Sequence, residues 1–276
     1  MSSHDISSPV AQSSSYDNNL AFLASVPNEL VKAKRGIEKE GLRVDSQNSL
    51  ALTPHPKKLG SPLCNSWVTT DFSESLLEFI TPTFDDVDAT VDYLEALHAV
   101  AYQNFEKSES IWAASMPCKL PADGDIPLAY FGESNIGKMK TVYRRGLGNR
   151  YGRSMQTVAG IHYNFSLPIS FWEKAFEHEP NSNKAQYDNL QDYINQRYLG
   201  LIRNFRRNYW LLVYLFGAAP CVDKSFLENR PHSLDLFNKD DFYIPLATSL
   251  RMGDLGYQSE AQKSLFICYN ELDNYI

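Results

Sequence analysis

The amino-acid sequence predicts an α+β protein, because it contains two kinds of hydrophobic periodicity. Segments 36–44 and 156–168 alternate between two sets of side chains, as strands do. Segments 86–105 and 190–216 place apolar residues three, four or seven positions apart, as amphipathic helices do. The helices do not alternate regularly with the strands along the chain, and this order favours α+β over a doubly wound α/β sheet.

The length, charge and composition of the chain limit the classes of function that it can have. The 276 residues fit one large domain or two small ones. A formal net charge of −7 and a pI of about 5.4 provide no overall cationic field for nucleic acid and fit a small-molecule substrate better. The longest apolar run, Trp210 to Pro220, is about half the ~20 residues of a membrane-spanning helix, and we interpret it as a buried helix end. The four cysteines form no C-x-x-C pair, which predicts free thiols and a cytoplasmic protein.

The first third of the chain begins with a Ser-rich segment, residues 1–20, for which we expect a disordered tail without the features of a secretory signal. A short helix is predicted over 21–34 and a strand over 36–44. The loop 53–62 contains three prolines. Segment 67–82 then predicts a pair of strands or a strand and a turn.

The rest of the chain begins with the predicted helix 86–105. An irregular segment, 116–137, is rich in Pro, Gly, Asp and Ser, and segments of this length are often functional. The strand 156–168 is expected to carry a polar face, and the helix 190–216 to stop at Gly217. Residues 261–276 have helical spacing and end at Ile276 without a cap, so we expect the natural chain to continue.

Two carboxylates, Glu38 and Glu40, fall on one face of the first strand. Their side chains are expected roughly 6 to 7 Å apart, close enough to share hard cations or a water network. The alternative is an ordinary solvent-facing pair.

A second group of carboxylates, Asp71, Glu74 and Glu78, lies among apolar residues. Glu78 is flanked by Leu77 and Phe79, and a buried carboxylate needs a cation or hydrogen-bond donors to offset its desolvation. A salt bridge in the core is the alternative interpretation.

His162 and Asn164 lie on the polar face of the strand 156–168. A neutral imidazole there can bind a metal ion or contact a phosphate, whereas a hydrogen-bonded core histidine is the alternative. Carboxylates with one histidine and no cysteine are typical of Mg²⁺ or Mn²⁺ sites rather than structural zinc. Magnesium usually acts together with substrate phosphates.

Basic residues suit anionic groups at two further places. Segment 138–152 with Arg153 can bind phosphate or carboxylate groups, or can be a solvated helix face. Arg251 is suited to bidentate binding of a carboxylate, with an ion pair to Asp254 as the alternative. No Walker phosphate loop and no G-x-G-x-x-G after a strand is present, so a nucleotide would bind through metal ions and basic side chains. These residues together indicate a Mg²⁺-dependent enzyme acting on phosphate-bearing and acidic small molecules.

Seven motifs together resemble the proteobacterial glutamate–cysteine ligase family. In chain order they are GIEKEGLRV, WVTTDFSESLLEFITP, SMPC, YRRGLGNRYG, MQTVAGIHYNFSLP, YLFGAAP and PLATSLRMGDLGY. Members of that family are about twice as long as this chain. The resemblance therefore predicts that residues 21–276 are the N-terminal part of a ligase catalytic domain, incomplete in this chain.

The resemblance implies a glutamine-synthetase-like fold, in which a curved, mainly antiparallel sheet flanked by helices forms an active-site funnel. It also implies joining of the γ-carboxyl of L-glutamate to the amine of L-cysteine, with ATP as co-substrate and Mg²⁺ or Mn²⁺ as the metal. This reaction is the first step of glutathione synthesis. No nucleic-acid or membrane partner is expected.

The resemblance further implies roles for individual residues. Glu38, Glu78 and Arg251 are the expected catalytic residues. The expected metal ligands are Glu38, Glu40, Asp71, Glu78 and His162. Arg251 is expected to read the substrate glutamate, with Gln156 and Val158 lining that region, and the expected cysteine pocket comprises Phe72, Tyr143, Leu147 and Tyr257. The resemblance gives no position for ATP.

Two other functions fit the sequence. One is a catalytically incomplete module that keeps the metal-binding and amino-acid-binding face without the ATP site. The other is a ligase of the same fold that uses a different amine.

Overall fold

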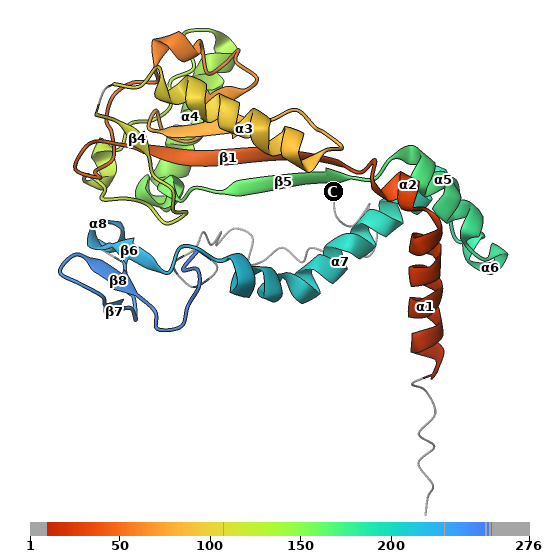
Figure 1. Ribbon diagram of the computed structural model, residues 1–276. Helices are drawn as coiled ribbons and strands as arrows, with labels where there is room; N and C mark the ends of the chain where they lie inside the picture. The colour runs from red at the N-terminus through yellow and green to blue at the C-terminus, as the bar shows by residue number, and fades with distance from the viewer. Residues whose placement is uncertain (1–9, 107, 229, 252, 254, 256–276) are drawn as a thin grey trace, which may run out of the picture. The chain divides into compact units, whose positions relative to one another are not determined.

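A computed structural model of the chain describes residues 10–106, 108–228, 230–251, 253 and 255 (Figure 1). The chain divides into two compact units. Unit 1 comprises Met1–Arg35, Phe165–Phe205 and Ile267–Ile276, and unit 2 comprises Gly36–Asn164 and Arg206–Phe266. The predicted helix over 261–276 lies outside the described residues.

Unit 1 is helical. It contains α1 (Val10–Ser25), α2 (Pro27–Leu30), α5 (Ile169–His178), α6 (Asn181–Lys184) and the first part of α7 (Leu190–Phe216). Aromatic residues dominate its core, where Trp172 packs edge-on against Phe171 and Tyr193. Pro27 separates α1 from α2, because proline is tolerated in the first turn of a helix but not in its interior. Residues 21–34 therefore form two helical pieces rather than the single helix that we expect from the sequence.

Helix α1 also includes residues 10–20, for which the composition predicts disorder. The segment from Ala11 to Ser25 contains no glycine or proline to interrupt a helix. Residues 10–20 are thus helical where we expect disorder, and residues 1–9 of the expected tail lie outside the described residues.

Glu29 of α2 is a buried carboxylate, 5% exposed, and is the basis of a pH prediction. Its oxygens accept hydrogen bonds from Lys174, at 2.7 Å, and from Ser170, and these bonds lower the pKa of Glu29 to about 2. A carboxyl whose pKa is lower in the folded state stabilises the protein above its unfolded pKa, near 4.5, and this stabilisation is lost as the pH falls toward 2. We expect Glu29→Gln to lower the urea midpoint at pH 7 and to lower it much less at pH 3.

The control for Glu29→Gln is Glu173→Gln, the same chemical change at an exposed position on α5. A loss of midpoint in Glu29→Gln that stays constant between pH 7 and pH 3 would contradict the assignment.

Unit 2 is built on a sheet with the strand order β2-β3-β1-β4, in which β5 also pairs with β1. The strands are β1 (Lys34–Val44), β2 (Val68–Thr70), β3 (Leu76–Ile80), β4 (Ser110–Ile111) and β5 (Ile161–Ser166). The pairs β1–β3, β2–β3 and β1–β4 are antiparallel. Strands β2 and β3 confirm the strand pair predicted over 67–82.

Helix α3 (Val87–Tyr102) packs against one face of this sheet (Figure 1). Leu77 and Phe79 of β3 are fully buried against Leu94 and Leu97 of α3. Asp86 caps the helix by accepting a hydrogen bond from the backbone N–H of Ala89 at 2.7 Å. The helix confirms the amphipathic segment predicted over 86–105 and leaves the opposite face of the sheet for polar residues.

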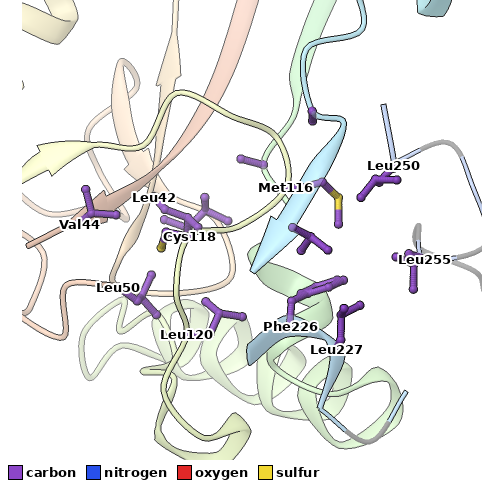
Figure 2. Close-up of a cluster of buried hydrophobic side chains, with 14 of the residues drawn as sticks. Leu42, Val44, Leu50, Met116, Cys118, Leu120, Phe226, Leu227, Leu250 and Leu255 are labelled. Carbon is purple, nitrogen blue, oxygen red and sulfur yellow. The ribbon is translucent and has the colours of Figure 1, made fainter. Parts of the chain in front are cut away.

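The remaining elements of unit 2 are α4 (Asn135–Tyr151), the short helix α8 (Lys224–Leu227) and a small antiparallel sheet of β6 (Cys221–Asp223), β8 (Asp241–Tyr243) and β7 (Asp235–Leu236). Short 3₁₀ turns occur at Lys57–Leu59, Asp123–Asp125 and Ser154–Thr157. Figure 2 shows the main core of the unit, where Leu42 and Val44 of β1 share one apolar cluster with Phe226, Leu227 and Leu250. The α+β class is therefore confirmed.

An ion pair is buried in unit 2. The guanidinium of Arg43, 1% exposed, contacts the carboxylate of Glu109, 3% exposed, at 2.8 Å. The second nitrogen of Arg43 donates to the backbone oxygens of Thr53, Pro54 and Glu74. Two charges are thus removed from water and compensated by each other, by backbone oxygens and by the hydroxyl of Thr53, which accepts from Arg43 and donates to Glu109.

Helix α7 has the predicted bounds, 190–216, but its second half is exposed. Trp210, Tyr214, Leu215 and Phe216 are 58–74% exposed, which corrects our interpretation of this run as a buried helix end. Among the described residues, no helix is long and apolar enough to cross a membrane.

Candidate active site

The carboxylates gather on the face of the sheet opposite α3. Glu40 of β1 is the register partner of Glu78 of β3, and Glu38 is the partner of Ile80 two positions along. Directly paired residues of an antiparallel pair point to the same face, so Glu38, Glu40 and Glu78 share one side. The intervening Lys39 lies on the other side, where its ammonium is 3.2 Å from His98 of α3.

Strand β5 adds polar side chains to the same face. One ring nitrogen of His162 lies 3.3 Å from Glu38 and the other lies 3.8 Å from Glu40. The side-chain amide of Asn164 donates to Glu38 at 2.7 Å, and the backbone N–H of Gly160 donates to Glu40 at 2.6 Å. The pairing of β5 with β1 thus brings together two motifs that lie more than 100 residues apart in the sequence.

Burial and repulsion between these carboxylates shift their pKa values. Burial, followed by the charges of Asp71, Glu40 and Glu38, raises the pKa of Glu78 to about 7. Burial and the charge of Asp71 also raise the pKa of Glu40. Burial raises the pKa of Asp71, although the guanidinium of Arg144 opposes this. Burial therefore opposes ionisation of all three carboxyls, and repulsion between carboxylates adds to this for Glu78 and Glu40.

A divalent cation would offset the burial and mutual repulsion of these carboxylates, and the donors, carboxylates with one imidazole, are those of Mg²⁺ or Mn²⁺ sites. Within the described part of the chain, however, no three His, Cys, Asp or Glu side chains form a group that could hold a metal ion. Glu38 and Glu40 are engaged by Asn164, His162 and Gly160 instead. The chemistry of the donors fits the metal, and its five expected ligands remain a prediction.

Glu74 does not belong to the carboxylate group, although the sequence places it with Asp71 and Glu78. It is 9% exposed, and its oxygens accept backbone N–H bonds from His55, at 2.5 Å, and Tyr130, at 2.6 Å. Backbone donors therefore compensate its burial, and its role is structural.

Arg251 lines a cavity of about 450 Å³ in unit 2, and Glu40 lines the same cavity. The guanidinium donates from Nη1 to the backbone oxygen of Ala159 and to Oγ of Ser115, which is 3.1 Å away. The cavity thus holds a cation able to bind a carboxylate, together with an acidic side chain. Gln156 and Val158 are not among its lining residues.

The expected cysteine pocket is only partly assembled. Phe72 is 1% exposed and lies close to Gly148 of α4, the helix that also carries Tyr143 and Leu147. Tyr143 is 63% exposed. Tyr257 lies outside the described residues.

Arg144 is the clearest functional candidate that the sequence analysis names only within a basic segment. Its guanidinium donates to the backbone oxygen of Asp71 and lies over the ring of Phe131, 4.4 Å from the ring centre. In the sequence, Arg144 is indicated only by the cluster of basic residues in α4. This cluster does not show which basic side chain points toward the sheet.

Comparisons with known proteins show which family the chain belongs to. The glutamate–cysteine ligase family model matches residues 20–276. The glutamate–cysteine ligase of Saccharophagus degradans is 55% identical over 245 residues, which are 88% of this chain and 45% of the relative. That of Alcanivorax borkumensis is 53% identical over 251 residues, with coverages of 90% and 46%.

Two solved structures are also similar. The glutamate–cysteine ligase of Francisella tularensis in complex with AMP has a TM-score of 0.79 and 40% identity, covering 88% of this chain and 46% of its own. A bifunctional glutathione synthetase from Pasteurella multocida has a TM-score of 0.78 and 28% identity, covering 94% of this chain and 31% of its own. The chain spans about half the length of the curated relatives it matches. Because the family model matches nearly all of the chain, the protein belongs to the glutamate–cysteine ligase family.

Proposed function

We propose that this chain carries part of the active site of a ligase that uses ATP to join the γ-carboxyl of L-glutamate to the amine of L-cysteine, the first step of glutathione biosynthesis. The observation that carries the proposal is the carboxylate face of β1 and β3 beside the cavity that Arg251 lines, in a chain of this family. The AMP complex of the Francisella tularensis relative supports a nucleotide substrate.

The sheet of unit 2 would form one wall of a curved, glutamine-synthetase-like funnel. Its antiparallel pairs and the placement of α3 on one face support this arrangement, because they leave the other face free to carry the site. The second half of the longer relatives would complete the funnel.

Residues of this chain would orient both amino acids. Arg251 would bind a carboxylate of L-glutamate through two parallel N–H bonds. Gln156 and Val158, which do not line the cavity, would contact the same amino acid only at its margin. Phe72, Tyr143, Leu147 and Tyr257 would enclose the small side chain of L-cysteine. Glu38, Glu40, Asp71, Glu78 and His162 would hold Mg²⁺ or Mn²⁺, which when bound would neutralise charge on the phosphates.

The chemistry follows from the low reactivity of a carboxylate. A γ-carboxylate oxygen takes the terminal phosphoryl group of ATP, which releases ADP and forms γ-glutamyl phosphate. The amine of L-cysteine then attacks the activated carbonyl carbon, and phosphate leaves with the oxygen that came from glutamate. The amine loses a proton as the amide forms.

A second function is favoured by the span of the chain, about half that of its relatives. The chain alone would then bind a metal ion and an amino acid without turning over. Release of ADP distinguishes the two functions, because binding alone consumes no ATP.

The test is a coupled assay of ADP release with ATP, Mg²⁺, L-glutamate and a panel of amines. We expect release that requires L-glutamate and is fastest with L-cysteine. Equal rates with L-cysteine and unrelated amines would instead indicate a ligase of the same fold with another amine. Absence of release together with binding of L-glutamate would favour the binding module.

Arg251→Lys should weaken L-glutamate binding about tenfold or more, because a point charge replaces a bidentate fork and a charged hydrogen bond contributes about 1.5–3 kcal/mol. Titration calorimetry of the chain with L-glutamate measures the change. The control is Arg197→Lys, the same substitution at a guanidinium that pairs with Glu179 in unit 1. An unchanged affinity in Arg251→Lys would remove Arg251 from the site.

A further inference from the structure

A single peptide group lies between the cation and the anion of the cavity. The backbone oxygen of Ala159 accepts hydrogen bonds from Nη1 of Arg251 and from Oγ of Ser115, the latter at 2.5 Å. The N–H of the same peptide group belongs to Gly160 and donates to Oε2 of Glu40 at 2.6 Å. One end of the peptide dipole thus meets the positive group and the other end meets the negative group.

This arrangement separates two charges that would otherwise attract each other. Burial raises the pKa of Glu40, and the guanidinium of Arg251 lies near enough for its charge to oppose this rise. Among the ion pairs of the described residues, however, Glu40 contacts His162 and not Arg251. The peptide group forms a hydrogen bond with each charged side chain. A direct ion pair between Arg251 and Glu40 would therefore gain less free energy.

A side chain at residue 160 would crowd the guanidinium of Arg251. A Cβ at this position would lie 3.1 Å from both Nη1 and Nη2 of Arg251 and 3.4 Å from Oε2 of Glu40. The first two distances are tighter than ordinary van der Waals contact, so the guanidinium would have to move. The backbone of Gly160 is anchored as well, because its oxygen accepts a bond from the N–H of Glu40 at 2.9 Å.

Ser115 holds the other side of the guanidinium. Its hydroxyl donates to the oxygen of Ala159 and accepts from Nη1 of Arg251, and its backbone oxygen accepts from the N–H of Ala159 at 2.9 Å. Both hydrogen bonds that the structure gives the Arg251 side chain start at Nη1. A guanidinium carries five N–H donors, and among the described residues only Nη1 of Arg251 donates a hydrogen bond, so Nε and Nη2 can face a ligand.

We propose that Ser115 and Gly160 are positioning residues of the glutamate site, which hold the guanidinium of Arg251 at Nη1 and keep it apart from Glu40 so that it remains available to a substrate carboxylate. Ser115 supplies the hydroxyl, and Gly160 supplies the space and the dividing peptide group. This inference rests on the proposed function for the identity of the ligand, but its geometric part concerns this chain alone.

The test uses two readouts on the intact chain. The first is the rate at which phenylglyoxal modifies Arg251, followed by peptide mass spectrometry, which needs no substrate. The second is the dissociation constant of L-glutamate. The variants are Ser115→Ala, Gly160→Ala and Ser115→Thr, which keeps the hydroxyl.

Matched control variants make the same two substitutions, Ser→Ala and Gly→Ala, elsewhere in unit 2. Ser75→Ala also deletes a hydroxyl that donates to a backbone oxygen, that of Ala51. Gly124→Ala adds a Cβ where nothing lies within 4 Å. Unfolding midpoints of all variants show whether an effect is local.

We expect Ser115→Ala to raise the modification rate of Arg251 at least threefold and to weaken L-glutamate binding severalfold. Gly160→Ala should change the modification rate by a similar factor and weaken binding about tenfold or more. Ser115→Thr and both controls should stay close to the original chain. If Gly160→Ala does not fold, Ser115→Ala with its rescue by Ser115→Thr decides the question.

The outcomes separate this inference from the proposed function. Unchanged reactivity of Arg251 in Ser115→Ala and Gly160→Ala would overturn the inference, whether or not L-glutamate binds. Changed reactivity in a chain that does not bind L-glutamate would uphold the positioning of Arg251 and count against the proposed substrate. Altered reactivity with unaltered L-glutamate affinity would overturn the link between this positioning and the substrate.

Discussion

Replacing Glu78 with glutamine is expected to lower the rate of γ-glutamylcysteine formation by about a hundredfold or more, because losing one preorganised electrostatic contact to a transition state costs about that much. Glu78 lies centrally on the carboxylate face, where Asp71, Glu40 and Glu38 all raise its pKa. Mass spectrometry of the product at saturating Mg²⁺ measures the rate. The control is Glu95→Gln on α3, an exposed position.

The same substitution should stabilise the fold at high pH. The pKa of Glu78 is raised from 4.5 to about 7, so the folded state binds more protons than the unfolded state between these values. Stability is therefore lost as the pH rises through this window. Glu78→Gln removes the cost, so its urea midpoint should exceed that of the original chain at pH 8 and match it at pH 4. A near-normal rate and an unchanged midpoint at pH 8 would take Glu78 out of the site.

Glu109→Ala is expected to lower the free energy of unfolding by about 3–5 kcal/mol, because it leaves a buried charge without its partner. Arg43 would keep its bonds to the backbone oxygens of Thr53, Pro54 and Glu74 but lose the carboxylate 2.8 Å away. Urea denaturation followed by circular dichroism measures the change.

Two comparisons make the Glu109 experiment decisive. Glu133→Ala breaks an exposed ion pair with Lys138 and a hydrogen bond from Tyr130, and should cost much less because water replaces these partners. The double change Arg43→Met and Glu109→Leu replaces both charges by apolar groups and should recover most of the loss. A cost of Glu109→Ala no greater than that of Glu133→Ala would show that Arg43 is not buried as the structure has it.

Local sequence patterns predict several helices and strands of this protein correctly. Alternation over Ile37–Leu42 correctly places Glu38 and Glu40 on one face, and the spacing of apolar residues gives α7 its bounds of 190–216. These features depend on neighbours within a few residues, which is the range over which periodicity operates.

The assembly of the site depends on longer distances, which periodicity does not encode. The register of Glu40 with Glu78 comes from the pairing of β1 with β3, and the contact of Ser115 with Arg251 joins residues 136 positions apart. Glu74 is indistinguishable from Glu78 in the sequence, yet backbone donors occupy its oxygens. The exposed apolar end of α7 shows the same limit of local sequence. An apolar run predicts a surface that favours burial, but it does not identify the segment that covers this surface.

The central claim is that this carboxylate face and the adjoining Arg251 cavity activate the γ-carboxyl of L-glutamate as an acyl phosphate. The most direct test supplies the chain with ATP, Mg²⁺, L-cysteine and L-glutamate labelled with ¹⁸O in the γ-carboxyl group, and analyses the released phosphate by mass spectrometry. The account predicts one ¹⁸O atom in each phosphate formed with γ-glutamylcysteine. Release of unlabelled phosphate together with γ-glutamylcysteine would contradict it.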